Sequence, residues 1–157
     1  MQIVVMGLGN TLQQDDGVGV AAVQALLARS EHWPHAELVD GGTLGLALLG
    51  YVEDATHLLL LDSVRTGAAP GTQVRLDGED IPLRLSTKLS PHQAGVVDLL
   101  AAAQLRGRLP SEIVVLGVEP GKIDWGTDLT PAVARQLNTL VAAARRQLDF
   151  WEEKARA

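Results

Sequence analysis

Three side chains in this sequence have the types and the local contexts needed to bind one divalent metal ion. Asp16 lies where a first helix is expected to begin, and Asp62 closes a buried apolar run that starts at His57. Because ligands in open parallel sheets bind beyond the carboxyl ends of the strands, both carboxylates are placed to face one crevice. His92 is expected in the first turn of a later helix, whose positive end favours the neutral imidazole that a metal requires.

The chemistry of this set is hydrolytic. Two carboxylates and one imidazole suit a borderline divalent ion such as zinc or nickel and leave coordination positions open for water or substrate. Such an ion polarises a carbonyl group or lowers the pKa of its bound water toward about 7. The sequence contains no cysteine, no G-x-S-x-G motif and no H-E-x-x-H motif, so the usual rival hydrolytic devices are missing.

Each of these residues also has a purely structural interpretation, which the sequence leaves open. Asp62 could cap the loop that follows its strand, and His92 could be an ordinary surface or core histidine. Asp15, beside Asp16, is interpreted as a helix cap, because a carboxylate at a helix start accepts hydrogen bonds from the first N–H groups. One cap does not require two acids, so Asp16 remains available for other work.

The glycine-rich segment Gly7-Leu8-Gly9 invites a dinucleotide-binding interpretation, which fails for two reasons. The third glycine of the fingerprint would fall at Leu12, and the acidic residue Asp40 comes too late for the usual ribose contact. Asp15 and Asp16 would also occupy the helix start that a pyrophosphate needs, and would repel it.

The elements that must position these residues alternate between strands and helices along the chain. Continuous apolar runs predict buried parallel strands, and apolar residues at helical spacing predict the helices between them. The segment 71–85 instead alternates around a turn at Asp77-Gly78, which predicts an antiparallel edge strand or hairpin. We expect one α/β domain over residues 1–157, a three-layer sandwich with a mostly parallel twisted sheet. The expected strands are 3–6, 37–40, 57–62 and 113–118, and the expected helices are 16–29, 43–52, 91–105 and 130–151.

Composition argues against several classes of partner. The net charge of −6 comes without any block of Lys or Arg, which argues against nucleic acid or an anionic membrane surface as partner. The start of the chain, Met1 to Gly7, lacks the features of a signal peptide and is too short to cross a bilayer. We therefore expect a cytoplasmic protein, and a monomer, because no heptad pattern demands a dimer.

Taken together, the motifs resemble those of the nickel–iron hydrogenase maturation endopeptidases. Each motif is modest alone, but their joint order and spacing are specific, and the resemblance covers nearly the whole chain. The matching segments are Gly7-Leu8-Gly9-Asn10-Thr11-Leu12, Asp15-Asp16-Gly17-Val18-Gly19, Asp40-Gly41-Gly42-Thr43, Leu61-Asp62, Ser90-Pro91-His92-Gln93 and Leu116-Gly117-Val118-Glu119-Pro120.

The resemblance implies an activity and a partner. Family members remove a short C-terminal extension from the hydrogenase large-subunit precursor once nickel has been inserted. Asp16, Asp62 and His92 match the family's metal-contacting positions and are the expected catalytic residues. The metal is expected to be nickel presented by the substrate, with zinc or another divalent ion as the alternative. Many members have glutamate where this chain has Asp16, so the carboxylate here reaches one methylene less far.

The turn Asp40-Gly41-Gly42-Thr43 matches a family segment linked with substrate handling. Gly41 and Gly42 are expected to allow the turn and the close approach of a peptide. Asp40 is equally well explained as a turn residue that bonds to nearby backbone.

Two other functions fit the same residues. One is a nickel-binding hydrogenase assembly chaperone that does not cut, and the other is a metallopeptidase that acts on a different substrate.

Overall fold

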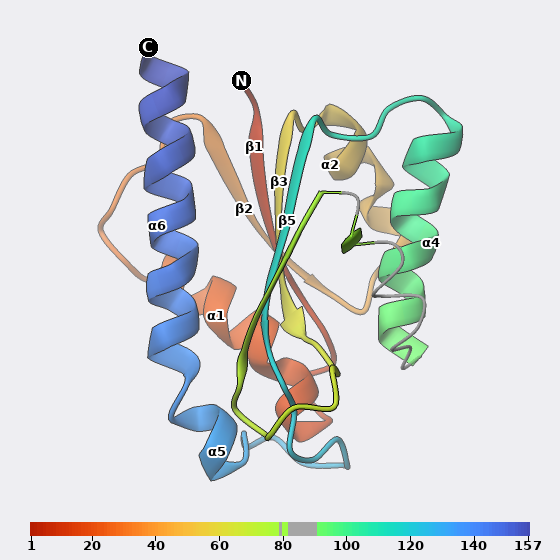
Figure 1. Ribbon diagram of the computed structural model, residues 1–157, viewed down its shortest axis with the longest axis vertical. Helices are drawn as coiled ribbons and strands as arrows, with labels where there is room; N and C mark the ends of the chain where they lie inside the picture. The colour runs from red at the N-terminus through yellow and green to blue at the C-terminus, as the bar shows by residue number, and fades with distance from the viewer. Residues whose placement is uncertain (79, 82–90) are drawn as a thin grey trace.

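The computed structural model describes residues 1–78, 80–81 and 91–157, and from 91 to 96 it describes the backbone alone. Within these residues the chain forms a five-stranded sheet in the order β2-β1-β3-β5-β4 (Figure 1). β1 pairs in parallel with β2 and β3, and β3 pairs in parallel with β5. β4 runs antiparallel to β5 at the edge. The strands are β1 Ile3–Leu8, β2 Ala36–Gly42, β3 His57–Ser63, β4 Gln73–Asp77 and β5 Glu112–Val118.

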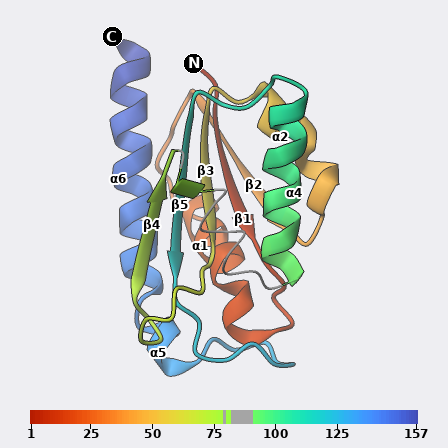
Figure 2. The ribbon, with the colours of Figure 1, turned by 45° about the vertical axis from the view of Figure 1, so that its right-hand side comes forward.

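Helices cover both faces of this sheet, as Figure 1 and Figure 2 show. α1 (Val18–Leu27) and α6 (Leu137–Arg156) pack on one face, and α2 (Leu49–Asp54) and α4 (Pro91–Leu105) on the other. Shorter helical segments complete the described fold: η1 (Gln14–Gly17), η2 (Gly45–Leu48) and α5 (Pro131–Ala134). The prediction of a three-layer α/β sandwich with a mostly parallel sheet and one antiparallel edge strand is confirmed.

The central strands supply both cores because successive side chains of a strand point to opposite faces. Leu59 and Leu61 of β3 join the core under α1 and α6, whereas Leu58 and Leu60 join the core under α2 and α4. Burial of each such leucine stabilises the fold by roughly 1.5–3 kcal/mol. This two-sided burial explains why β3 is a continuous apolar run in the sequence.

Several predicted boundaries differ from the observed ones. The first helix begins with the 3-10 turn η1 before α1, and the closing helix is divided into α5 and α6. In place of the second predicted helix there are η2 and α2. β4 is the first arm of the expected hairpin, but the second arm lies almost wholly outside the described residues. Within the described chain, no helix combines the length and the apolar character needed to cross a membrane.

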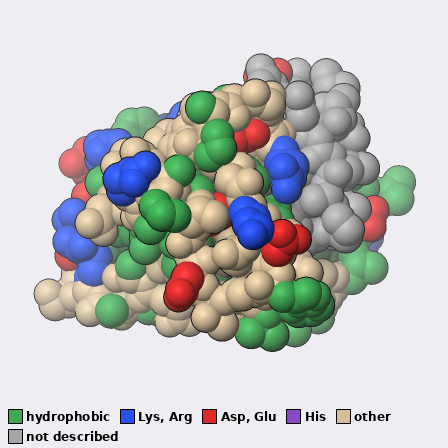
Figure 3. All heavy atoms as spheres, turned by 90° about the horizontal axis from the view of Figure 1, so that it is seen from below, with side chains coloured by type: hydrophobic (Ala, Val, Ile, Leu, Met, Phe, Trp, Pro, Cys, Tyr) green, Lys and Arg blue, Asp and Glu red, His purple; other side chains and the backbone are tan. Residues whose placement is uncertain are grey.

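β1, β3 and β5 end at the same edge of the sheet, at the bottom of Figure 1, and both termini lie at the opposite end. η1 follows β1 at this carboxyl edge. We use the term carboxyl edge for this end of the sheet, where the parallel strands finish. Figure 3 shows the molecule from that side.

Candidate active site

Asp16 and Asp62 meet at the carboxyl edge of the sheet. Asp16 belongs to η1, directly after β1, and Asp62 is the penultimate residue of β3. Both carboxylates are buried, with Asp16 0% and Asp62 3% exposed. The backbone of Asp16 and the carboxylate of Asp62 both lie against Gly9: a side-chain carbon there would sit 1.9 Å from the Asp16 carbonyl oxygen and 3.5 Å from Asp62 Oδ1. The structure therefore brings the two acids together, as the topology predicted.

Ser63 contacts both carboxylates. Its backbone N–H donates to Asp62 Oδ1 at 2.8 Å, and its hydroxyl donates to Asp16 Oδ1 at 3.2 Å. On the other side, the Asn10 N–H donates to Asp16 Oδ2 at 2.8 Å. Since both oxygens of Asp16 accept hydrogen bonds, the orientation of its carboxylate is set by the end of β3 and by the loop after β1.

Two glycines allow the helix that follows Asp16 to approach the sheet. A side-chain carbon on Gly19 of α1 would lie 2.1 Å from the Leu61 carbonyl oxygen of β3. One on Gly7 of β1 would lie 2.5 Å from the Gly19 carbonyl oxygen. Any larger residue at either position would move α1 away from the strands, so the glycines of this region bring η1 and its acids up to β3.

His92 lies in the first turn of α4, and its side chain is outside the described residues. Among the side chains that are described, no group of three or more His, Asp or Glu is arranged to hold a metal ion. The donor set of Asp16 and Asp62 still fits a divalent ion, because two carboxylates offer hard oxygen ligands side by side. Ligation by all three residues stays a prediction.

The end of β2 borders the same region. Asp40, Gly41 and Gly42 are its last residues, so the turn expected over 40–43 begins only at Thr43. Asp40, Gly42 and Thr43 line a small hollow of about 140 Å³ together with residues of the loop after β1 and of α1. Asp40 accepts a hydrogen bond from Gln24 Nε2 of α1 at 2.8 Å. Gly42 has a φ of +48°, which suits a glycine, and its carbonyl oxygen accepts a hydrogen bond from the N–H of Gly9 at 3.0 Å.

Gly41 has a packing role at this end of β2. It is buried, and a side-chain carbon there would lie 2.8 Å from Leu8 and 3.0 Å from Leu48. It does not line the hollow beside Asp40. A role of Asp40, Gly41, Gly42 and Thr43 in binding substrate stays a prediction.

The interpretation of Asp15 as a helix cap is wrong. Its buried carboxylate accepts four hydrogen bonds from the segment after β5: from the N–H groups of Gly121 (2.8 Å), Lys122 (2.9 Å) and Thr130 (2.7 Å), and from the Thr130 hydroxyl (2.7 Å). These partners lie more than a hundred residues away in the chain, so no local pattern indicates them. Asp15 joins η1 to the segment that precedes α5.

Sequence reasoning also missed the role of Glu119. This buried carboxylate accepts hydrogen bonds from the N–H and the hydroxyl of Thr66 (2.6 and 3.1 Å) and from the N–H of Gly67 (3.0 Å). It fixes the loop after β3 just as Asp15 fixes the segment after β5. The available signal was its position directly after an apolar strand, the same signal that identified Asp62.

Comparison with known proteins places this arrangement in a family. The family model for hydrogenase maturation proteases matches residues 20–147. The chain is 39% identical over 152 residues to the hydrogenase expression/formation protein HupD of Rhodobacter capsulatus, covering 96% of this chain and 72% of that protein. It is 38% identical over 134 residues to the hydrogenase 2 maturation protease of Escherichia coli, covering 85% and 82%.

A solved structure agrees with these sequence relatives. The hydrogenase maturating endopeptidase HybD from Escherichia coli superimposes with a TM-score of 0.89 at 35% sequence identity, covering 95% of this chain and 93% of that one. The chain therefore belongs to the hydrogenase maturation protease family, a family of endopeptidases.

Proposed function

We propose that this protein removes the C-terminal extension of a nickel–iron hydrogenase large-subunit precursor after nickel has been inserted. Membership of the maturation protease family supports this substrate class. The observation that carries the proposal is the pair of buried carboxylates, Asp16 and Asp62, which Ser63 connects at the carboxyl edge.

The nickel ion is part of the substrate in this proposal. The precursor presents it, and Asp16, Asp62 and His92 supply ligands that complete its coordination. Binding the ion positions the adjacent tail and makes cleavage depend on correct metal loading. No resident metal is then needed to recognise the substrate.

Peptide hydrolysis follows by general base catalysis. One of the two carboxylates takes a proton from a water molecule, whose oxygen attacks the carbonyl carbon of the scissile peptide. The C–N bond then breaks, the leaving nitrogen takes up a proton, and the products are a carboxylate and an amine. The neighbouring hollow, lined by Asp40, Gly42 and Thr43, provides backbone and side-chain groups that can form hydrogen bonds with the C-terminal extension of the precursor.

The decisive experiment compares cleavage of nickel-loaded and nickel-free precursor by mass spectrometry. We expect loss of the C-terminal extension from the loaded precursor alone. Equal cleavage rates for the two forms would contradict recognition through nickel.

The two alternatives predict different outcomes, the first in this experiment and the second in separate assays. A precursor that binds the protein but keeps its mass would indicate an assembly chaperone. Metal bound to the purified protein, together with hydrolysis of unrelated peptides, would indicate a metallopeptidase of broader substrate range.

A further inference from the structure

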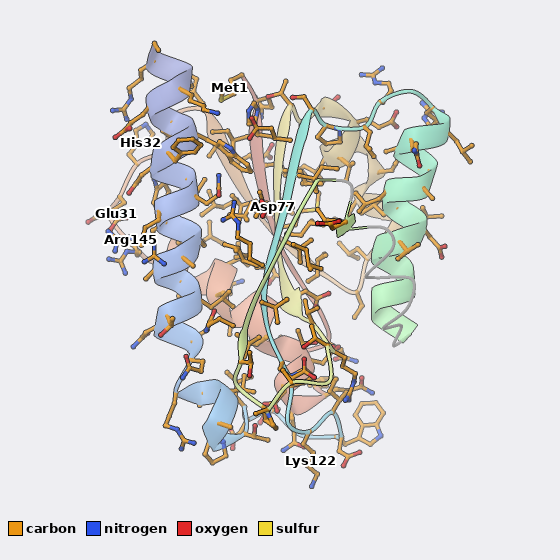
Figure 4. The ribbon with its side chains drawn as sticks, viewed as in Figure 1. Met1, Glu31, His32, Asp77, Lys122 and Arg145 are labelled. Atoms are coloured by element: carbon orange, nitrogen blue, oxygen red, sulfur yellow. The ribbon has the colours of Figure 1, made fainter. Side chains whose placement is uncertain are left out.

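The segment between β5 and α5 is held tightly against the loop after β1. Beyond the four bonds to the Asp15 carboxylate, the Asp15 N–H donates to the Lys122 carbonyl at 3.2 Å. The Gln14 N–H donates to the Gly126 carbonyl, and the Gly126 N–H donates to the Leu12 carbonyl, both at 2.9 Å. The middle and both ends of the segment 121–130 are therefore fixed. Lys122, labelled in Figure 4, marks its place at the carboxyl edge.

This ordered segment exposes a large apolar side chain. Trp125 is 78% exposed, whereas the other two tryptophans, Trp33 and Trp151, are 8% and 0% exposed. Leu12, joined to the neighbouring Gly126 by the bond described above, is 55% exposed. A single exposed apolar residue is ordinary, but here two from distant parts of the chain stand on backbone segments that the Gly126–Leu12 bond holds side by side. We call Trp125 and Leu12 the patch.

The backbone that carries the patch is hydrogen-bonded to the candidate active site. The Leu12 N–H donates to Asn10 Oδ1 at 2.9 Å, and the Asn10 N–H in turn donates to Asp16 Oδ2. Leu44, which follows Thr43 of the lining of the hollow, is also exposed. Figure 3 shows hydrophobic side chains among charged ones on this face.

We propose that Trp125 and Leu12 form a docking surface for the folded body of the hydrogenase large-subunit precursor, whose tail enters the neighbouring site. This inference rests on the proposed function. The segment that carries Trp125 is bonded to Gln14 and Asp15, which directly precede Asp16, so a protein substrate whose tail reaches Asp16 brings its folded body close to Trp125. A second copy of this chain seated here would compete with that substrate. Tryptophan is among the residues that contribute most to protein interfaces, and a backbone already fixed before binding lowers the entropic cost of association.

Fluorine NMR can test the contact directly. The protein is labelled with 5-fluorotryptophan, which gives one resonance for each of its three tryptophans, and Trp125→Phe assigns the exposed one. Adding unlabelled nickel-loaded precursor is expected to shift or broaden the Trp125 resonance and to leave those of Trp33 and Trp151 unchanged. A shift that instead depends on the concentration of this protein without precursor would indicate self-association and would overturn the proposal.

Cleavage kinetics provide the second readout. Trp125→Ala is expected to raise KM about 30-fold, the equivalent of an interface residue worth about 2 kcal/mol, with kcat unchanged. The matched control is Phe150→Ala, because Phe150 is also an exposed aromatic residue (51%) but lies on α6. The control is expected to leave both constants unchanged.

The outcomes separate the two proposals. If the precursor is cleaved while the Trp125 resonance and the KM of Trp125→Ala stay unchanged, docking at this surface is wrong and the proposed function stands. If the precursor is neither bound nor cleaved, the proposed function fails, and the docking surface fails with it.

Discussion

Ser63 connects two acids that lie forty-six positions apart in the chain. Its backbone N–H can reach Asp62 whatever the side chain, but its hydroxyl is what reaches Asp16. The serine thus divides its two donors between the two carboxylates. This arrangement leads to different expectations for changes at Asp62 and at Ser63.

Asp62→Asn is expected to abolish processing of the precursor while preserving the fold. The amide is isosteric with the carboxylate but is not a general base and is a poorer ligand for a divalent ion, so the cleavage rate should fall at least about 10²–10⁴-fold. Mass spectrometry of the precursor measures the loss, and circular dichroism checks the fold. Processing at the rate of the unchanged protein would show that Asp62 is not an active-site residue.

Ser63→Ala is expected to weaken cleavage by less. The alanine keeps the N–H that donates to Asp62 but loses the hydroxyl that donates to Asp16, a hydrogen bond to a charged group worth about 1.5–3 kcal/mol. We expect kcat to fall roughly 10–100-fold if that bond orients Asp16 for catalysis. Ser63→Thr, which retains a hydroxyl, is the matched variant and should recover most of the rate in a single-turnover assay.

At the scale of elements, two buried carboxylates fasten the loops around the site to the sheet. Asp15 holds the segment before α5, and Glu119 holds the loop after β3. Each carboxylate accepts hydrogen bonds from several backbone N–H groups. Leaving such groups buried without a partner would cost free energy. The carboxyl edge is therefore ordered by side chains as well as by strand pairing.

Asp15→Ala is expected to lower the free energy of unfolding by about 3 kcal/mol, because it removes the acceptor of four hydrogen bonds at once. Urea denaturation measures the change. The control is Asp77→Ala, whose exposed carboxylate pairs with Arg75 on β4 and should contribute no more than about 1 kcal/mol. Equal effects of the two changes would show that Asp15 does not fasten the segment.

At the scale of the whole molecule, His57 couples stability to pH. It begins β3 and packs edge-on against Trp151 of α6, with ring centroids 5.1 Å apart. Burial lowers the pKa of His57 below its usual 6.5, although the carboxylate of Glu112 opposes this. In the unfolded chain the imidazole binds a proton as the pH falls through about 6.5, while in the folded chain it stays neutral to a lower pH.

Below pH 6.5 the unfolded state therefore binds more protons than the folded state does. The stability that His57 provides is complete above that pH, and it is lost as the pH falls toward the lowered pKa of the folded state. We expect the difference in unfolding free energy between the unchanged protein and His57→Gln to shrink from pH 7.5 to pH 5.5. Denaturant titrations at both pH values measure it. An equal difference at both pH values would contradict this coupling.

Much of the fold could be predicted from the sequence because hydrophobic periodicity is local. The run from His57 to Leu61 indicates a strand buried on both faces, and the strand–helix alternation indicates a mostly parallel sheet. The helix boundaries were less predictable. Where α1 begins depends on the 3-10 turn η1, which is tied by Asp15 to a distant segment.

Sequence by itself determined that Asp62 ends a buried strand and that Asp16 follows another, and parallel strands share one carboxyl edge, so their meeting could be predicted. Only the tertiary structure decided that Ser63 connects them, that Asp15 fastens a segment over a hundred residues away, and that Leu12 pairs with Gly126, next to Trp125 in the chain. These contacts depend on how loops return over the sheet edge. Hydrogen bonds between residues so distant in the chain leave no periodic pattern in the sequence.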